Sequence, residues 1–194
     1  MVLLGDLLNA EDFGKAMDGL AREFRDKHRL PEIHQLGLIA QDVEHAARGL
    51  EDQGVDPFFI ADGSAASWRE RGQERSFRGK MGLAYYQGFE FELLEPGEGS
   101  DFYRQSLDPE GGIVVQHLGF LVQDVDEWAD QLTAAGSPVW IRGKLKMGPM
   151  GADFAYVDTV EEAGIVIEFI SWRTFGRISQ PLAGLFRLLG RLEK

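Results

Sequence analysis

Glutamates at alternate positions of one short run are the first residues in this sequence that could do chemistry. The run FEFEL at residues 89–93 places Glu90 and Glu92 between apolar side chains. In a strand, this alternation puts both carboxylates on one face and the apolar side chains on the other. Two carboxylates in a partly enclosed site repel each other unless a cation or a proton relieves them. The spacing therefore indicates metal binding or proton transfer. The ordinary alternative is that these glutamates lie on a solvated face of the strand. For Glu90, the favoured interpretation is a carboxylate in water at the rim of the site.

Imidazoles are few in this chain and thiols are absent. The histidines are His28, His34, His45 and His117, and there is no cysteine. The missing thiols exclude disulfides, thiolate zinc sites, iron–sulfur clusters and a cysteine nucleophile. His28 and His45 fall on predicted helices, so structural roles are expected for them.

The sequence contains two copies of one pattern. LGLIAQDV at residues 36–43 aligns with LGFLVQDV at residues 118–125, with five of the eight positions identical. Further along, GFEFE at residues 88–92 aligns with GIVIE at residues 164–168, so Glu92 and Glu168 hold equivalent positions. The same alignment pairs Gln35 with His117. Two copies indicate a duplicated module packed about a pseudo-twofold axis rather than a solenoid.

Each copy predicts a strand, a helix and three further strands. Aspartates at the start and glycines at the end bound the two helices, from Asp42 to near Gly54 and from Asp124 to near Gly136. A hairpin turn is predicted at residues 87–88, and the polar stretch at residues 62–80 makes the first copy the longer one. The predicted strands cover residues 36–40, 58–61, 82–86 and 89–94 in the first copy, and 114–122, 139–142, 152–157 and 165–170 in the second.

Two amphipathic helices are predicted outside the copies. The first covers residues 9–28, with Asn9 as its N-cap and an apolar stripe of Phe13, Met17, Leu20 and Phe24. The second covers residues 181–193, with a leucine-rich stripe and arginines on its polar side. The second helix is expected to dock on the back of the sheet or in a dimer interface.

A paired β-α-β-β-β chain with His-x-Gly on a first strand and Glu on a last strand resembles the vicinal oxygen chelate superfamily. That superfamily includes glyoxalase I, methylmalonyl-CoA epimerase, extradiol dioxygenases and the fosfomycin- and bleomycin-resistance proteins. The resemblance covers about residues 33–171 and rests on HLGFLVQDV at 117–125, ELLEP at 92–96 and IEFI at 167–170. It implies an α+β fold in which two βαβββ modules pair into a cupped mixed sheet, with extra N- and C-terminal helices.

The domain division that follows has five parts. They are an N-terminal helical extension (1–30), the first module (31–96), a linker (97–113), the second module (114–172) and a C-terminal amphipathic helix (173–194).

The resemblance also implies one divalent metal ion, held where the modules meet by the first and last strand of each. On this chain it points to Gln35, Glu92, His117 and Glu168 as metal ligands, with His34 as the alternative to Gln35. QLG at residues 35–37 matches HLG at residues 117–119, whereas His34 is one residue too far from the glycine. A shift of one residue in a strand moves the side chain to the opposite face, so Gln35 is expected to face the metal and His34 to point away. A β-bulge would reverse this assignment.

One imidazole, two carboxylates and one amide suit Mn, Co, Ni, Mg or Zn better than a dedicated redox iron, although the sequence does not distinguish these ions or Fe.

The resemblance then implies a metal-dependent enzyme of the glyoxalase or epimerase type, an isomerase or lyase. It would chelate vicinal oxygens of its substrate and move a proton with Glu92, Glu168 or Glu90. The alternatives are a non-catalytic, antibiotic-type binding protein and an extradiol-type dioxygenase, which would need a second histidine ligand such as His34.

Composition limits the partners. The chain has 194 residues, 44% of them hydrophobic, and a net charge of −12, so one or two domains with a real core are expected and nucleic-acid binding is not. Apolar runs are too short for a membrane span, and the N-terminus lacks the basic start of a secretory signal, which leaves a cytoplasmic location as the default.

A small-molecule substrate with a hydrophobic body is the expected partner, and the flanking helices could build a homodimer. The apolar and aromatic residues expected to line the cup are Ile39, Leu94, Leu121, Ile170 and some of Tyr85, Tyr86, Phe154 and Tyr156.

Overall fold

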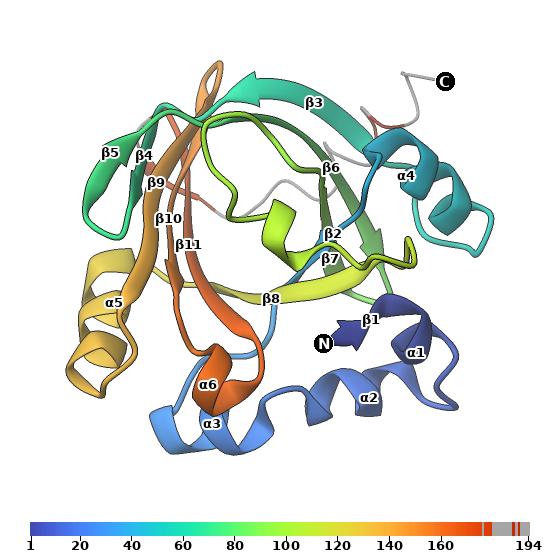
Figure 1. The fold of residues 1–194 in the computed structure, drawn as a ribbon, viewed down its shortest axis with the longest axis horizontal. Coiled ribbons are helices and arrows are strands. Elements are labelled where there is room, and N and C mark those ends of the chain that lie inside the picture. Colours follow the sequence, from blue (N-terminus) through green and yellow to red (C-terminus); the bar gives the residue numbers. More distant parts are fainter. Residues whose placement is uncertain (176, 180–187, 189, 191–194) are drawn as a thin grey trace.

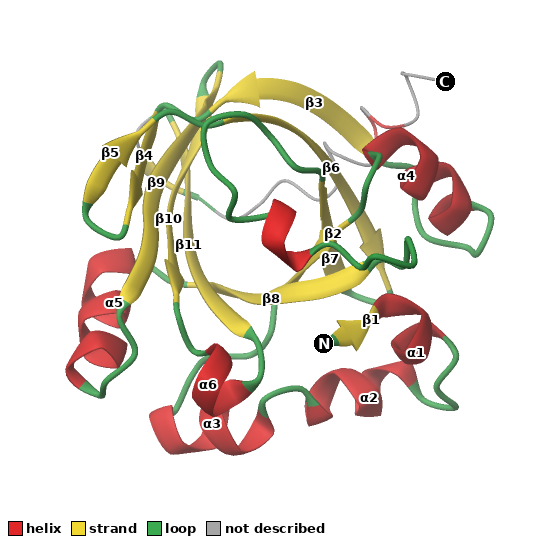
Figure 2. Ribbon diagram, in the orientation of Figure 1, coloured by secondary structure: helices red, strands yellow, loops and turns green. Residues whose placement is uncertain are grey.

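The computed structural model describes residues 1–175, 177–179, 188 and 190 of the chain. Within them, one mixed β-sheet of twelve strands curls into a ring, and helices lie around its outside (Figure 1, Figure 2). This arrangement confirms the predicted α+β class and the cupped sheet of the vicinal oxygen chelate fold.

The two modules repeat one strand order. In each module the last strand pairs in parallel with the first, and the middle strands follow as antiparallel neighbours. A short helix, α6 (Val160–Ala163), precedes the last strand of the second module. The first module consists of β2 (Gln35–Ile39), α4 (Val43–Glu51), β3 (Phe59–Ser64), β6 (Arg78–Tyr86) and β7 (Phe89–Leu94), and the second of β8 (Val114–Leu121), α5 (Val125–Ala134), β9 (Val139–Met147), β10 (Met150–Val157) and β11 (Val166–Thr174).

The modules join where β2 pairs antiparallel with β8. Around this junction the strand order is β3-β6-β7-β2-β8-β11-β10-β9, so the second module repeats the strands of the first in reverse order across the sheet. The predicted pseudo-twofold axis therefore passes between β2 and β8. As a result, the first and last strands of both modules lie side by side at the centre of the sheet.

Local signals in the sequence fix the ends of the module helices. The Asp42 carboxylate accepts a hydrogen bond from the backbone N–H of His45 at the start of α4, and Asp124 accepts from Asp126 and Glu127 at the start of α5. The turn between β6 and β7 consists of Gln87 and Gly88, both with positive φ (48° and 93°), as in a type I′ hairpin.

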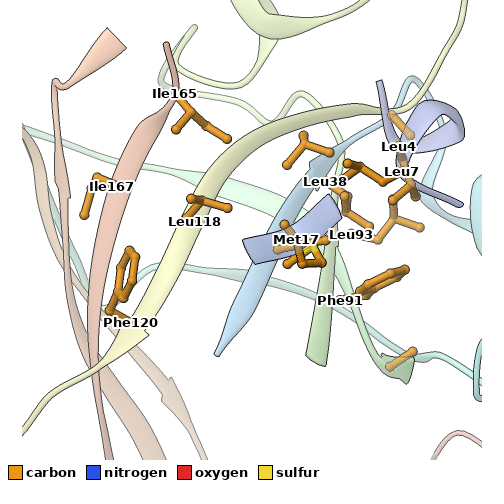
Figure 3. Close-up of a cluster of buried hydrophobic side chains, with 14 of the residues drawn as sticks. Leu4, Leu7, Met17, Leu38, Phe91, Leu93, Leu118, Phe120, Ile165 and Ile167 are labelled. Carbon is orange, nitrogen blue, oxygen red and sulfur yellow. The ribbon is translucent and has the colours of Figure 1, made fainter. Parts of the chain in front are cut away.

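The main hydrophobic core lies on the outer face of the sheet, under the helices. Figure 3 shows Leu4, Leu7 and Met17 from the N-terminal helices gathered against Leu38 and Leu93 from the first module. The second module adds apolar residues from β8 and from the segment at β11, which include Leu118, Phe120, Ile165, Ile167 and Phe169. The alternation read from the sequence thus holds, since the neighbours of Glu92 and Glu168 face this core.

The prediction of one continuous N-terminal helix over residues 9–28 is wrong. The segment forms β1 (Val2–Leu3), which pairs with β8, and three short helices, α1 (Leu4–Leu8), α2 (Phe13–Gly19) and α3 (Arg22–His28). Asn9 is the C-cap of α1 rather than an N-cap, Asp12 caps α2, and Ala21 breaks the path with a left-handed φ of 49°. Phe13, Met17 and Phe24 are buried as expected, because the breaks let the segment follow the curved outside of the sheet.

The polar stretch that lengthens the first copy forms two unpredicted strands, β4 (Ser67–Glu70) and β5 (Gln73–Arg75). β4 pairs with β9, the outermost strand of the second module, whereas β3 lies at the opposite end of the sheet. The link between β3 and β4 is hydrogen-bonded to both modules. The Ala65 N–H donates to the Phe77 carbonyl just before β6, and the Ala66 N–H donates to the Lys144 carbonyl in β9. An insertion of the first module therefore closes the ring against the second.

The C-terminal segment departs from the predicted helix at its start. Arg173 and Thr174 still belong to β11, and β12 (Arg177–Ile178) pairs back on them, so these four residues are strand and not the beginning of a helix. The helix predicted over residues 181–193 falls almost entirely outside the described residues. Among the residues that the structure describes, no helix is long and apolar enough to span a membrane.

The role of the insertion can be tested with two tryptophans. Trp68 in β4 is only 2% exposed and stacks on Phe77 at 4.4 Å, whereas Trp140 in β9 is half-buried. We expect Trp68→Ala to lower the free energy of unfolding by about 4 kcal/mol, measured by urea denaturation, because it empties a packed site. Trp140→Ala is the matched control and should cost less than half as much. A loss of unfolding free energy for Trp68→Ala that is as small as the loss for Trp140→Ala would show that the β4–β5 hairpin is not part of the core.

Candidate metal centre

Three side chains from three central strands converge on the inner face of the sheet. Glu92 comes from β7, His117 from β8 and Glu168 from β11, and all three are buried. His117 Nε2 lies 3.3 Å from Glu92 Oε2 and 3.2 Å from Glu168 Oε2. One ligand atom from each residue falls within 4.8 Å of the others. The structure thus brings together three of the four residues that the resemblance implied.

The facing atoms of these residues have no hydrogen-bond partner. Glu92 Oε2, His117 Nε2 and Glu168 Oε2 are each shielded from solvent, and the ion-pair distances given above join them only to one another. A buried polar atom without a partner costs about 1–3 kcal/mol, and more when it is charged. Three such atoms turned toward one another form an arrangement that a shared cation would satisfy.

The neighbour of His117 in the chain sets its tautomer. Gln116 Oε1 lies 2.6 Å from His117 Nδ1, so Nδ1 carries the hydrogen and donates it to the amide oxygen. Nε2 then faces the two carboxylates, where it can hold a second proton or, once that proton is lost, offer its lone pair to a metal ion. The contact depends on a β-bulge, because the register between β2 and β8 shifts between Gly37 and Leu38 and leaves Gln116 unpaired. Sequence reasoning missed Gln116, since a regular strand would have turned it to the outer face.

A glycine makes room for the imidazole. Gly37 on β2 lies opposite His117, and a Cβ built on Gly37 would fall 1.7 Å from His117 Cε1. The ring therefore lies directly on the Gly37 backbone. The glycine of the first copy's motif is needed for this close approach and not for a turn.

Gln35 enters the site from β2 with one end of its amide bound. Its Nε2 donates a hydrogen bond to Glu90 Oε1 at 2.8 Å, while its Oε1 is buried without a partner. The side chain lies over Gly119, with Oε1 2.6 Å from where a Cβ of that glycine would be. Gly119 is the register partner of Glu168. The amide oxygen is thus left free in the region between β8 and β11.

Glu90 is fully buried, which corrects the expectation of a solvated rim carboxylate. It also accepts a short hydrogen bond from Tyr85 Oη, in addition to the one from Gln35. Burial raises the pKa of Glu90 to about 7, although the Tyr85 hydrogen bond opposes this shift. Glu90 holds the amide of Gln35 and does not line the cavity described below.

His34 lies just before β2 and does not join the three converging residues. Its Nε2 is 3.9 Å from Glu90 Oε2, so the ring approaches Glu90 instead of turning fully away. Burial lowers the pKa of His34 to about 4, which keeps the imidazole neutral. The described contacts of this ring do not reach Glu92, His117 or Glu168.

The electrostatics at His117 follow from the two carboxylates. Burial alone would lower its pKa, but the charge of Glu168 and then that of Glu92 outweigh burial and raise it to about 9. Burial also raises the pKa of Glu168. In the absence of a metal ion, a proton on His117 is therefore the cation that this site retains.

A cavity of about 320 Å³ opens onto the carboxylates of Glu92 and Glu168. Its walls are mostly apolar and aromatic. Of the predicted lining residues, Leu94, Phe154 and Tyr156 contribute, whereas Tyr86 packs on the outside against Phe13. Three further aromatic residues of the wall had no motif to predict them: Trp68 and Phe77 come from the insertion in the first module, and Tyr103 comes from the linker.

Lysines lie at the edge of this cavity. Lys80 and Lys146 line it, and Lys80 is paired with Glu44 at 2.7 Å. Lys144, two residues earlier on β9, pairs with Asp153 at 3.2 Å and is not part of the lining. Lys146 is therefore better placed than Lys144 to contact an anion in the cavity.

Comparisons with known proteins concern the fold alone. No protein-family model matches the sequence, and no curated protein matches it. Among solved structures, methylmalonyl-CoA epimerase from Mycobacterium tuberculosis is similar at 15% identity, covering 78% of this chain and 91% of that one with a TM-score of 0.46. A Streptomyces coelicolor methylmalonyl-CoA epimerase variant in complex with 2-nitronate-propionyl-CoA is similar at 18% identity, covering 78% and 99% with a TM-score of 0.48. A variant of 4-hydroxymandelate synthase from the same organism is similar at 16% identity, covering 85% of this chain and 56% of that one with a TM-score of 0.47.

The raised pKa of His117 predicts how the metal-free protein responds to pH. Between the ordinary pKa of 6.5 and the folded value of about 9, only the folded state holds this proton. The free energy of unfolding should therefore be highest below pH 6.5 and fall as pH rises toward 9, by up to about 3 kcal/mol in total. Urea denaturation with chelator present measures the loss. His117→Asn should flatten the profile and the exposed control His45→Asn should keep it; an unchanged slope in His117→Asn would contradict the assignment.

Proposed function

We propose that this protein is a metal-dependent enzyme that chelates two neighbouring oxygens of a small substrate and moves a proton on the adjacent carbon. Gln35, Glu92, His117 and Glu168 would hold one divalent cation. The proposal is carried by one observation: the buried atoms Glu92 Oε2, His117 Nε2 and Glu168 Oε2 face one another without a hydrogen-bond partner, and both carboxylates line the cavity.

The donor set fits a divalent ion of hard or borderline character. Two carboxylates and one imidazole favour Mn, Co, Ni, Mg or Zn, and the free Oε1 of Gln35 would add a neutral oxygen. Gln116 supports the same reading, because a metal-ligating histidine donates its other N–H to a fixed acceptor. When bound, the cation would act as a Lewis acid that stabilises negative charge on the chelated substrate oxygens.

The protein groups have separable roles in this scheme. Glu90 would orient Gln35, because its carboxylate takes the amide N–H and leaves the amide oxygen for the ligand position. Glu92 or Glu168, which line the cavity, would take the proton from substrate carbon. Glu90 was a third candidate base, but its full burial away from the cavity favours the orienting role.

The apolar walls support a substrate with a hydrophobic body, and Lys146 at the edge would suit a negatively charged end. Assembly as a homodimer and a cytoplasmic location remain expectations from the sequence.

The two alternatives differ in what they require. An extradiol-type dioxygenase would need a second histidine beside His117, and the contacts of His34 favour Glu90 instead. A non-catalytic binding protein would use the same cavity without a metal. Metal content separates this last reading from the proposal, and iron-dependent oxygen uptake with a catechol would revive the dioxygenase.

Metal content is the first test. Protein purified without chelator and without an affinity-tag metal, then dialysed against Mn, Co, Ni or Zn salts, should retain about one ion per chain in elemental mass spectrometry. His117→Gln and Glu168→Gln each remove one donor at nearly constant shape and should retain less than about a tenth of that. His45→Gln and Glu161→Gln change the same residue types at exposed positions and should bind like the wild type.

The same assay decides the position on β2. Gln35→Ala should weaken metal binding by about 10-fold or more, and His34→Ala should leave it unchanged. The reverse result would assign the ligand to His34. No metal in the wild-type protein would overturn the enzyme proposal and leave a binding cavity.

Proton transfer has its own readout. Metal-loaded protein in deuterium oxide should exchange the hydrogen next to the carbonyl in at least one small compound with two neighbouring oxygens, followed by NMR. Glu168→Gln should reduce the exchange rate by about 100-fold or more, because it removes both a ligand and a candidate base. Glu161→Gln should exchange at the wild-type rate. Exchange that survives in Glu168→Gln would exclude this residue from the reaction.

A further inference from the structure

The segment between the two modules places a tyrosine in the cavity. Residues 95–113 run between β7 and β8, and their one short helix, η1 (Arg104–Ser106), follows Tyr103 directly. In Figure 1 this yellow-green segment lies across the ring of strands. Tyr103 is 3% exposed and lines the same cavity as Glu92 and Glu168.

The segment is held firmly enough to fix this side chain. Ser100 Oγ donates to Glu70 Oε2 of β4 at 2.8 Å and accepts from the Phe102 N–H at 3.1 Å. Phe102 is fully buried and packs on Trp140 and Tyr156 at ring distances of 5.1 and 4.9 Å. Tyr103 therefore sits on an anchored backbone and not on a free loop.

Aromatic neighbours fix the ring of Tyr103. Phe77 lies edge-on at 5.4 Å and Trp68 at 6.1 Å, both from the insertion that closes the sheet. The ring is packed on apolar surface, and the hydroxyl is the polar end that reaches the cavity side.

The hydroxyl pairs with a second phenol beside the metal ligands. Tyr103 Oη and Tyr156 Oη are 3.0 Å apart and buried. Tyr156 is the register partner of Glu168, and its ring lies edge-on to His117 at 4.9 Å. Two phenols carry two hydroxyl hydrogens, and their mutual hydrogen bond uses one of them. The second hydrogen is available to a third oxygen: without a ligand the Glu168 carboxylate beside Tyr156 is one acceptor for it, and a ligand oxygen in the cavity would be the other.

We propose that Tyr103, supported by Tyr156, is a substrate-binding residue whose hydroxyl donates a hydrogen bond to an anionic oxygen of a compact ligand in this cavity. The inference rests on the proposed function, since that oxygen would belong to the pair chelated at Glu92, His117 and Glu168. Hydrogen bonds from preorganised donors in a dry site are strong where negative charge develops. The ligand class is thus a small oxygen chelator that carries its negative charge on one chelating oxygen.

Calorimetric titration of the cobalt-loaded protein with acetohydroxamate tests the inference. Acetohydroxamate is a small anion that chelates divalent ions through two neighbouring oxygens. Tyr103→Phe removes only the hydroxyl and should raise the dissociation constant of this probe by about 10-fold, the effect of one hydrogen bond to a charged acceptor. Tyr156→Phe should raise it as well. Tyr86→Phe, at a half-buried tyrosine that packs against Phe13 outside the cavity, is the matched control and should leave it unchanged.

The affinity for cobalt and the melting temperature distinguish the outcomes. Cobalt affinity should stay at its wild-type value in Tyr103→Phe, because this residue is not placed among the ligands, while the melting temperature should fall by a few degrees because the buried Tyr156 hydroxyl loses a partner. Unchanged probe binding in Tyr103→Phe would overturn the inference while leaving the proposed function intact. Cobalt affinity that falls by the same factor as probe affinity would also overturn it, since Tyr103 would then only shape the metal site. A wild-type protein that binds no cobalt would refute the proposed function and this inference together.

Discussion

Two carboxylates and an imidazole nitrogen facing one another out of water create the electrostatic problem on which this structure depends. Glu92, His117 and Glu168 occupy three central strands, and each has a buried atom turned to the same point. The main apolar core lies on the outer face of the sheet, so its packing would tolerate many different residues on the inner face. The inner face is different, because repulsion among these groups must be balanced by a proton or by a metal ion. The β-bulge at Gln116 and the glycine at position 37 are both explained by holding the imidazole in that place.

Duplication explains the position of the centre but not its surroundings. The mirror order of strands brings the ends of both modules to one axis, so equivalent positions of the two copies supply the central residues. The cavity walls break this symmetry. Trp68 and Phe77 come from an insertion found in one copy, and Tyr103 comes from the segment that joins the copies. The symmetric part of the fold thus builds the polar centre, and the asymmetric part determines what can lie next to it.

Repetition and alternation in the sequence were enough to predict the module strands, the capped helices and the inward faces of Glu92, His117 and Glu168. These features are local or are repeated, so each copy supports the reading of the other. The single N-terminal helix was wrong because apolar spacing continues through the breaks at Asp12 and Ala21, and spacing does not report backbone direction. Gln116 and Tyr103 could not be predicted, since a bulge and a long-range approach of the linker leave no periodic signal. The burial of Glu90 was missed because its partners Gln35 and Tyr85 belong to other strands.

The closed ring of strands also restricts how two copies of this chain could exchange parts. The modules are joined along two seams, β2 with β8 and β4 with β9, and the first module contributes one strand to each. Swapping a module between chains would require both seams to open at once, and would expose backbone edges on either side. A chain with a single seam could trade modules through one flexible linker. Both seams are made within one polypeptide here, so the pair of modules is complete without a second copy.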